Sequence, residues 1–431
     1  MMLRRHLQKF PRRPFLIATL ILSLFYLALN SCSSTRIILQ TAPNQPTKNS
    51  NIIGLSYDNY ESWNADRDRI INLLKRDIYG DVPQGFNIDN IIKTPLETQG
   101  YEGQSAAEIW QITQSYKRDD GQKMSMKYNI VLVLPQSDIP VSLITMQNFC
   151  PSHVVLPRLE IQASSHRFCE GDGILSSIFE YIFGRYIRRP PIKEILNKNY
   201  GFVTFYPAAV IPDHPQLGRK ALDHYFGTSH RGAAHNASAI AAWAFMWMGT
   251  ATALADDPRI DKQNIAALGH SRYGKSALLA AALSQDISAV ISHQSGTGGA
   301  SLSRGKKGET VTQIMASYPH WFAPNYAKYD RGMKHDIEQH HLLALIAPKS
   351  LLLGNARRDV WSDPQGGFQA AQLASPIYDL YGRNGLTAAK LNQFISTDNI
   401  AYWIRPGTHG ITKEDWDAFF QFLDIHIEKE N

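Results

Sequence analysis

The sequence predicts an α/β fold with a mostly parallel central sheet, helices on both of its faces and an antiparallel N-terminal edge. Two observations predict it. After residue 200, short apolar runs alternate with longer Ala- and Leu-rich stretches, which is typical of strand–helix–strand units. Before residue 200, apolar runs of strand length follow one another without an intervening helix, which indicates antiparallel strands.

Each predicted element follows from its local pattern. An amphipathic helix is expected at residues 66–76, where apolar residues recur at helical spacing until Gly80 and Pro83 interrupt the pattern. Short apolar runs rich in branched and aromatic residues predict strands at 108–113, 126–134, 142–146, 202–206, 264–268, 289–292, 350–353 and 401–404. Longer apolar or amphipathic stretches predict helices at 237–255, 276–283, 368–374 and 413–429.

The first 31 residues predict an export signal that is separate from the fold. Basic residues open the chain, and residues 15–29 form an apolar run that is short for a membrane span. The run ends just before Cys32, with Leu29 three residues earlier, and so resembles a bacterial lipobox in which Cys32 is lipidated and becomes the mature N-terminus. An ordinary secretory signal cut nearby is the alternative.

Export changes the meaning of the net charge. The whole chain carries +6, but residues 1–31 hold five basic and no acidic residues, which leaves +1 for the remainder. The charge therefore does not indicate nucleic acid as a partner. The polar residues 32–55 predict a flexible tether, and residues 56–431 a single catalytic domain. We expect a monomer, lipid-anchored to a bacterial membrane and facing the periplasm or the cell surface.

Cys150 and Cys169 remain in the exported chain. Both follow a Phe in loop-like segments, and cysteines can pair in an oxidising compartment, so we predict a disulfide between them. Two buried thiols are the alternative.

The segment 269–276 carries a motif that fits two kinds of site. Its sequence, Gly-His-Ser-Arg-Tyr-Gly-Lys-Ser, matches a phosphate-binding loop, and it also places Ser271 as a nucleophile on a strand-to-helix turn. ATP and GTP are scarce outside the cytoplasm, and the apolar strand at 289–292 is not followed by the acid that would hold Mg²⁺. We therefore interpret Ser271 as the nucleophile of a serine hydrolase.

A serine nucleophile needs a base and an acid that orients the base. Asp359 and His409 each follow a predicted strand, and the chain order Ser, Asp, His is that of the α/β-hydrolases. We predict Ser271, His409 and Asp359 as the catalytic residues, with Asp363 as the rival acid. The predicted sheet and the order of these residues together indicate an α/β-hydrolase fold.

Two cations lie beside the predicted nucleophile. The backbone N–H of Arg272 would begin the next helix, where it is placed to stabilise an oxyanion. Lys275 lies one turn further along, so its side chain can face the same cleft. Two cations beside a serine indicate a substrate with a negative or strongly polar array of oxygen atoms.

A loose group of histidines and acids occurs near residue 338. It lacks the spacing of a zinc site, so we expect no metal ion, and no other cofactor is expected. Its members are His335, Asp336, Glu338, His340 and His341.

The segment 269–275 resembles the G-C/H-S-R-x-G-K motif of the glucuronoyl esterases, carbohydrate esterase family 15. The resemblance covers roughly residues 60–430, and is strongest after residue 235. Further similar segments are 257–261, 295–300, 319–322, 339–348, 359–364 and 405–409.

The resemblance implies hydrolysis of the ester that joins 4-O-methyl-glucuronic acid of plant cell-wall glucuronoxylan to lignin alcohols. It implies Ser271 as nucleophile, His409 as base and Arg272 as oxyanion stabiliser. The residues that it implies as sugar contacts are Lys275, Glu309 and Trp361.

Gln294 departs from the family pattern. Many members have a glutamate acid here, whereas a glutamine can accept a hydrogen bond from histidine but cannot balance an imidazolium charge. Asp359 would then serve alone as the acid. Two other functions stay open: a deacetylase acting on xylan or another polysaccharide, and a surface lipoprotein that binds uronate-rich glycans with weak or no catalysis.

Overall fold

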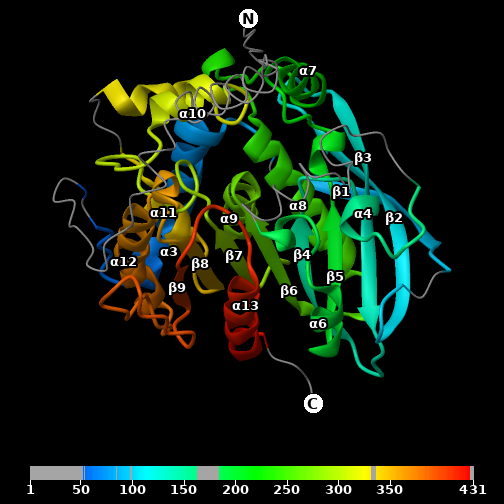
Figure 1. Ribbon diagram of the computed structural model, residues 1–431. Coiled ribbons are helices and arrows are strands. Elements are labelled where there is room, and N and C mark those ends of the chain that lie inside the picture. The colour runs from blue at the N-terminus through cyan, green and yellow to red at the C-terminus, as the bar shows by residue number, and fades with distance from the viewer. Residues whose placement is uncertain are drawn as a thin grey trace, which may run out of the picture.

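A nine-stranded sheet runs through the molecule in the order β1-β2-β3-β5-β4-β6-β7-β8-β9 (Figure 1). The computed structural model describes residue 52 and residues 54–83, 85–97, 100–162, 184–331 and 336–427. The pairs β1–β2, β2–β3 and β3–β5 are antiparallel, and the pairs from β5–β4 to β8–β9 are parallel. This sheet confirms the predicted fold class. The strands are β1 (Phe86–Pro95), β2 (Gln104–Lys117), β3 (Lys123–Pro135), β4 (Val141–Gln147), β5 (Tyr200–Phe205), β6 (Ile260–His270), β7 (Ala289–His293), β8 (Ser350–Ala356) and β9 (Ile400–Arg405).

Helices cover both faces of the sheet, because side chains along each central strand point alternately to the two sides. Ala267 and Leu353 belong to one apolar core, whereas their neighbours Ala266 and Leu352 belong to the other. The larger core is closed by α3 (Tyr60–Leu74), α8 (Ala239–Ala255), α9 (Arg272–Leu283), α11 (Gln339–Leu345) and α12 (Pro364–Leu380). The smaller core is closed by α4 (Ser152–Val155), α6 (Ile192–Asn197) and α13 (Lys413–His426).

Helix α8 supports the strand-to-helix turn that follows β6. It is apolar on all sides, and Trp243 and Trp247 are completely buried. Ser238 caps its N-terminus by accepting a hydrogen bond from the Ala241 N–H at 3.3 Å. Helix α9 packs on α8 and on strands β6 and β7, so the turn between β6 and α9 is held by buried elements on several sides.

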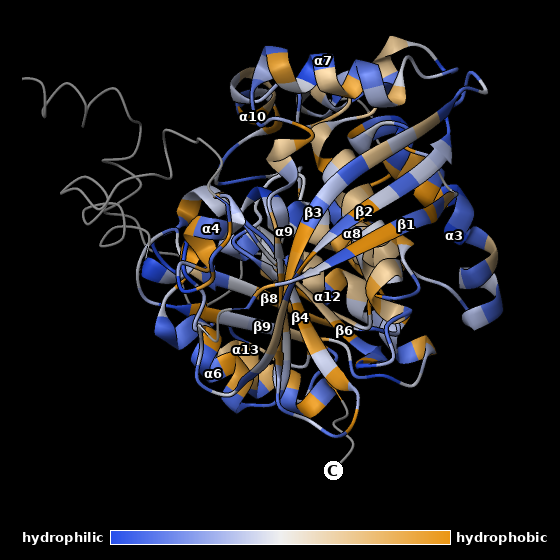
Figure 2. Cartoon of the chain, turned by 90° about the vertical axis from the view of Figure 1, so that its right-hand side faces the viewer, coloured by the Kyte–Doolittle hydropathy of each residue, from blue (hydrophilic) through white to orange (hydrophobic). Residues whose placement is uncertain are grey.

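Some elements have no predictive pattern in the sequence. Strand β1 is an edge strand with mostly exposed residues, so it lacks the apolar run of a buried strand. Helix α7 (Pro215–Phe226) mixes hydrophilic and hydrophobic residues, as Figure 2 shows, and only a few of its side chains are buried. Helix α3 begins at Tyr60, earlier than the predicted 66, because Asn59 caps it, and it continues into a π-helical turn at Lys75–Tyr79.

Several predictions concern residues at or beyond the limits of the described chain. Residues 1–31, Cys32 and Cys169 lie outside it, as does most of the predicted tether. Ile52 is buried, so the packed part of the chain reaches back to that residue. Cys150 is disulfide-bonded. Among the described helices, none combines the length and the apolar character that a membrane span requires.

Candidate functional site

Ser271 lies on a sharp turn between β6 and α9. Its backbone has φ 56° and ψ −123°, a conformation that non-glycine residues rarely adopt and that often marks a functional site. Its N–H donates to the carbonyl of His293 on β7 at 2.8 Å. The turn needs a glycine at position 269, since a Cβ there would lie 2.1 Å from the carbonyl oxygen of Tyr273. This geometry is that of a nucleophile elbow.

Arg272 opens helix α9, where the first N–H groups of an α-helix have no intrahelical acceptor and favour negative charge. Its guanidinium lies over the ring of Trp321, 4.8 Å from the centroid, and forms an ion pair with Asp213. Asp213 also accepts a hydrogen bond from the Trp321 indole at 2.6 Å and contacts His320 Nε2 at 3.0 Å. Asp213 therefore fixes both the guanidinium and the ring that stacks on it.

His409 and Asp359 are in direct contact. His409 Nδ1 lies 2.8 Å from Asp359 Oδ2, the carboxylate is buried, and a third of the His409 side chain is exposed. Burial alone would raise the pKa of Asp359, but the charge and hydrogen bond of His409 and hydrogen bonds with Ser362 outweigh it and lower this pKa. Asp359 is therefore held as an anion against His409, as an orienting acid must be.

Asp363 has a different task from Asp359. It caps helix α12 by accepting a hydrogen bond from the Gly366 N–H at 3.0 Å, and its carboxylate lies 3.8 Å from Lys306 Nζ. The two acids that the sequence left as rivals are thus separated by geometry, and Asp359 is the one in contact with His409.

Gln294 follows β7 directly and reaches the loop that carries His409. Its Oε1 accepts from the Gly410 N–H at 2.7 Å, and its Nε2 donates to the Thr408 carbonyl at 3.2 Å. The structure thus joins Gln294 to the backbone on either side of His409.

Of the three residues implied as sugar contacts, Lys275 and Glu309 are buried, and Trp361 is half-buried and hydrogen-bonded to Glu309. Lys275 Nζ donates to the carbonyl oxygens of Ser295 and, at 2.6 Å, Thr297. Burial lowers the pKa of Lys275 to about 7, although the charge of Glu309 opposes the shift. Burial likewise raises the pKa of Glu309, opposed by Lys275 and by a hydrogen bond with Trp361.

A chain of buried polar side chains was missed by the sequence-based reasoning. His270 Nδ1 lies 3.0 Å from His293 Nδ1, and His293 Nε2 lies 3.2 Å from Asp415 Oδ1. The His270 ring also packs against His409, with centroids 4.6 Å apart. The available signal was positional: His270 and His293 end adjacent strands and pair in register.

Arg405 was also missed, although it ends β9 just before the His409 loop. Its Nε donates to Asp415 at 2.6 Å, and its Nη2 donates to the carbonyls of Thr408 at 3.2 Å and Gly410 at 2.7 Å. Arg405, buried at the end of β9, therefore holds the backbone of the His409 loop in place.

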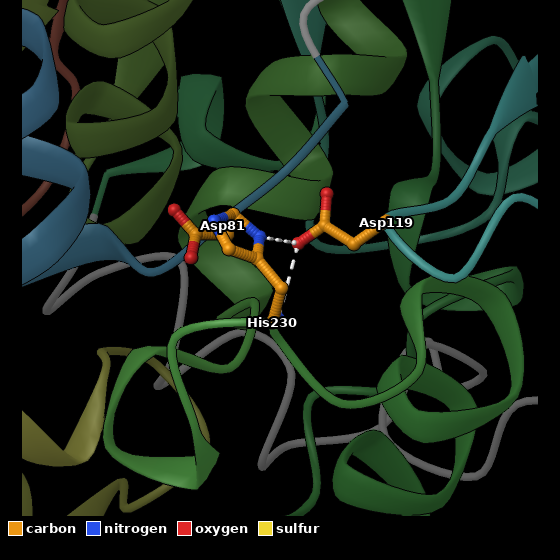
Figure 3. A group of neighbouring side chains, drawn as sticks. All are labelled: Asp81, Asp119 and His230. Atoms are coloured by element: carbon orange, nitrogen blue, oxygen red, sulfur yellow. Dashed lines mark hydrogen bonds and ion pairs between the residues drawn. The ribbon is translucent and has the colours of Figure 1, made fainter.

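One group of three side chains within the described residues has the spacing of a metal site: Asp81, Asp119 and His230 (Figure 3). His230 Nδ1 lies 2.7 Å from Asp119 Oδ2. Asp81 instead pairs with Arg231, whose guanidinium already neutralises it and competes with a cation. Glu338, from the loose group seen in the sequence, accepts hydrogen bonds from the backbone of Ser303 and Arg304, and His335 lies outside the described residues.

Comparison with known proteins places this chain in a family. The chain is 33% identical over 386 residues to a carbohydrate esterase from an unknown prokaryotic organism, with 87% of each chain covered. This chain belongs to carbohydrate esterase family 15, the glucuronoyl esterases. A model of fungal glucuronyl esterases matches residues 190–382. The fold is similar to that of a promiscuous esterase of this family from a marine bacterial metagenome (TM-score 0.72, 30% identity, 90% of this chain and 97% of that chain).

Other glucuronoyl esterases support the assignment. The structure of the enzyme from Solibacter usitatus is similar with TM-score 0.71 and 27% identity, over 90% of this chain and 98% of that one. The 4-O-methyl-glucuronoyl methylesterase 1 of Phanerochaete chrysosporium is 32% identical over 162 residues, which are 35% of this chain and 34% of that protein. The protein is a carboxylic ester hydrolase, as the sequence predicted.

Proposed function

We propose that this glucuronoyl esterase cleaves its substrate through an acyl-enzyme formed on Ser271. The observation that carries the proposal is the 2.8 Å contact between His409 Nδ1 and the buried Asp359 carboxylate. His409 donates its Nδ1–H to Asp359, which leaves Nε2 as the base that takes the proton of Ser271 Oγ. The serine then attacks the ester carbonyl, and the backbone N–H and guanidinium of Arg272 stabilise the oxyanion.

The second half of the reaction reuses the same groups. The protonated His409 gives its proton to the leaving alcohol, and a water molecule, activated by the same imidazole, hydrolyses the acyl-enzyme. A uronate ester carries its hydroxyl groups next to the reacting carbonyl, and the charged and aromatic groups of Lys275, Glu309 and Trp361 suit such a ring. The proposed substrate is the glucuronoyl ester of plant glucuronoxylan.

The test uses protein that lacks residues 1–32 and compares two substrates, benzyl glucuronate and acetylated xylan. Hydrolysis of the glucuronate is expected, and kcat should fall by about 10⁴-fold or more in Ser271→Ala and in His409→Ala. Labelling of Ser271 by a fluorophosphonate reports the nucleophile independently of the substrate. Preference for acetylated xylan would make the protein a deacetylase, and glycan binding without labelling or turnover would make it a binding protein.

We further propose that the protein is exported and anchored through lipid on Cys32. The basic start, the apolar run at 15–29 and the Leu29–Cys32 spacing support this proposal. Radiolabelled palmitate should enter the full-length protein and not a Cys32→Ser variant; equal labelling of both would contradict the anchor. Light scattering of the soluble form tests the expected monomer.

A further inference from the structure

Gln294 stands where many members of the family have an acid. Its side-chain amide instead makes two hydrogen bonds to the backbone of the loop that carries His409, and we call these two hydrogen bonds the brace. It follows β7 with φ 51°, and its N–H donates to the carbonyl of Gly354 on β8 at 2.8 Å. This left-handed backbone turns the chain sharply at the strand end. Gln294 as a whole is 2% exposed, so its side-chain amide must find partners inside the protein.

Both ends of the amide are matched by the loop backbone. The carbonyl end accepts from the N–H of Gly410, and the NH₂ end donates to the carbonyl of Thr408. The residue between these two backbone groups is His409. A glutamine side chain carries one acceptor and one donor group, and this site uses one of each.

A carboxylate could satisfy only one of these contacts. An ionised glutamate accepts hydrogen bonds and donates none, so at position 294 it would face the Thr408 carbonyl with a lone pair in a buried setting. Arg405 also donates to the Thr408 carbonyl, but it reaches no N–H of the loop because it carries only donors. The Gly410 N–H therefore depends on the amide oxygen of Gln294.

Asp359 and Gln294 thus act on different parts of His409. Asp359 contacts the His409 ring at Nδ1, where it orients the imidazole and balances its charge. Gln294 contacts the backbone on each side of the same residue, where it sets the position of the Cα from which the ring projects. A shift of about 1 Å in a catalytic group can lower a rate by about 10²-fold, so a brace of this kind has kinetic consequences.

We propose that Gln294 is a positioning residue for His409, and that its amide cannot be replaced by a carboxylate. The inference rests on the proposed role of His409 as the base and deepens it. The charged and titratable groups around this loop come from five elements, and their protonation also affects any measurement made at several pH values. They are His270 at the end of β6, His293 on β7, Arg357, Arg358 and Asp359 after β8, Arg405 on β9, and Asp415 on α13.

The first experiment compares Gln294→Met, which keeps the length of the side chain without its polar groups, with Gln294→Glu. Both should lower kcat on benzyl glucuronate by about 10- to 100-fold with KM changed less than about threefold. The matched control is Gln111→Glu, the same change at an exposed position of β2, which should leave kcat unchanged. Wild-type activity of Gln294→Met, or higher activity of Gln294→Glu, would overturn the proposal.

The second experiment asks whether position 294 can act as the acid. In the Asp359→Asn background, Gln294→Glu should restore no activity, because it breaks the brace and does not contact the His409 ring. Restoration by tenfold or more would show that position 294 is an acid site and would overturn the proposal. At low pH the introduced glutamic acid is protonated and again has a donor for the Thr408 carbonyl. The kcat/KM of Gln294→Glu, divided by that of wild type, should therefore increase as the pH is lowered from 8 to 5. A ratio that stays constant or decreases as the pH is lowered would contradict the proposed need for a donor at position 294.

A third measurement does not depend on turnover. Hydrogen exchange in peptides covering residues 406–412 should be at least tenfold faster in Gln294→Met than in wild type, and nearly unchanged in Asp359→Asn. Equal protection in wild type and Gln294→Met would overturn the brace even in an inactive protein. Conversely, an inactive wild type with faster exchange in Gln294→Met would remove the proposed function and leave the positioning role intact.

Discussion

His270 and His293 face each other through their Nδ1 atoms, 3.0 Å apart and fully buried. Two nitrogen atoms at this distance need one proton between them. His293 Nε2 lies against the Asp415 carboxylate, so it carries a proton and, in a neutral ring, leaves Nδ1 as an acceptor. His270 must then donate from its own Nδ1. Its Nε2 is left as an acceptor, and that atom is buried without a hydrogen-bond partner among the residues that the structure describes.

This arrangement predicts that both rings stay neutral through physiological pH. Burial lowers the pKa of His293, and burial and the neighbouring His409 lower the pKa of His270 still further. Nitrogen-15 NMR should find the Nδ1–H tautomer for His270 and the Nε2–H tautomer for His293 between pH 7 and pH 8. An imidazolium signal from either ring in this range would contradict the assignment.

We predict that Asp415 makes the free energy of unfolding depend on pH in the acidic range. Burial opposes ionisation, but His293 and Arg405 outweigh it and depress the folded-state pKa of Asp415 well below its usual value. A depressed carboxyl pKa contributes stability above the unfolded pKa of about 3.9, and this contribution is lost as the pH falls through the folded pKa. Asp415→Asn leaves Arg405 buried without its counter-charge, so it should lower the free energy of unfolding by about 3–5 kcal/mol at pH 7.

Urea denaturation at pH 7 and at pH 3 measures this effect. The difference in the free energy of unfolding between wild type and Asp415→Asn should be smaller at pH 3 than at pH 7. The control is Asp417→Asn on the same helix, where the carboxylate is exposed and pairs with exposed Lys413, and where the change should stay below about 0.5 kcal/mol. If Asp415→Asn lowers the free energy of unfolding by the same amount at both pH values, the depressed pKa of Asp415 does not contribute to stability as predicted.

Asp359 and Asp363 offer a matched pair of substitutions. Asp359→Asn keeps the shape but removes the charge that balances the His409 imidazolium, so kcat should fall by about 10⁴-fold. Asp363→Asn retains a side-chain oxygen that caps α12, and asparagine caps helices about as well as aspartate. It should change kcat by less than about threefold. The reverse ranking, in kcat measured on benzyl glucuronate, would transfer the acid role to Asp363.

The sequence predicted the central strands and the residues at their ends because buried strands are short, apolar and followed by functional loops. Ser271, Asp359 and His409 could therefore be selected by chain order. The exposed strand β1 lacks that apolar signal. The residues that hold the site were also hidden, because their roles depend on contacts between distant segments. Asp213 meets Arg272, and Gln294 meets the Gly410 N–H more than a hundred positions away.

The buried amine of Lys275 gives the last prediction. Its folded pKa, lowered to about 7 by burial, lies below the unfolded value of about 10.4, so the folded protein binds fewer protons than the unfolded chain between these values. Stability contributed by this position is therefore lowest below about pH 7 and rises with pH through that window. The unfolding free energy of wild type, relative to Lys275→Met, should increase from pH 7 to pH 9 by up to about 1.4 kcal/mol per pH unit.

Glu309 lies close enough to influence this titration, so the same comparison belongs in a Glu309→Gln background as well. There Lys275 loses the negative charge that most strongly raises its pKa, so this pKa should fall further and the window in which stability rises should begin at a lower pH. A pH-independent difference in both backgrounds would mean that Lys275 keeps its proton up to pH 9. The amine would then be a permanent cation at the proposed sugar site instead of a group that titrates near neutral pH.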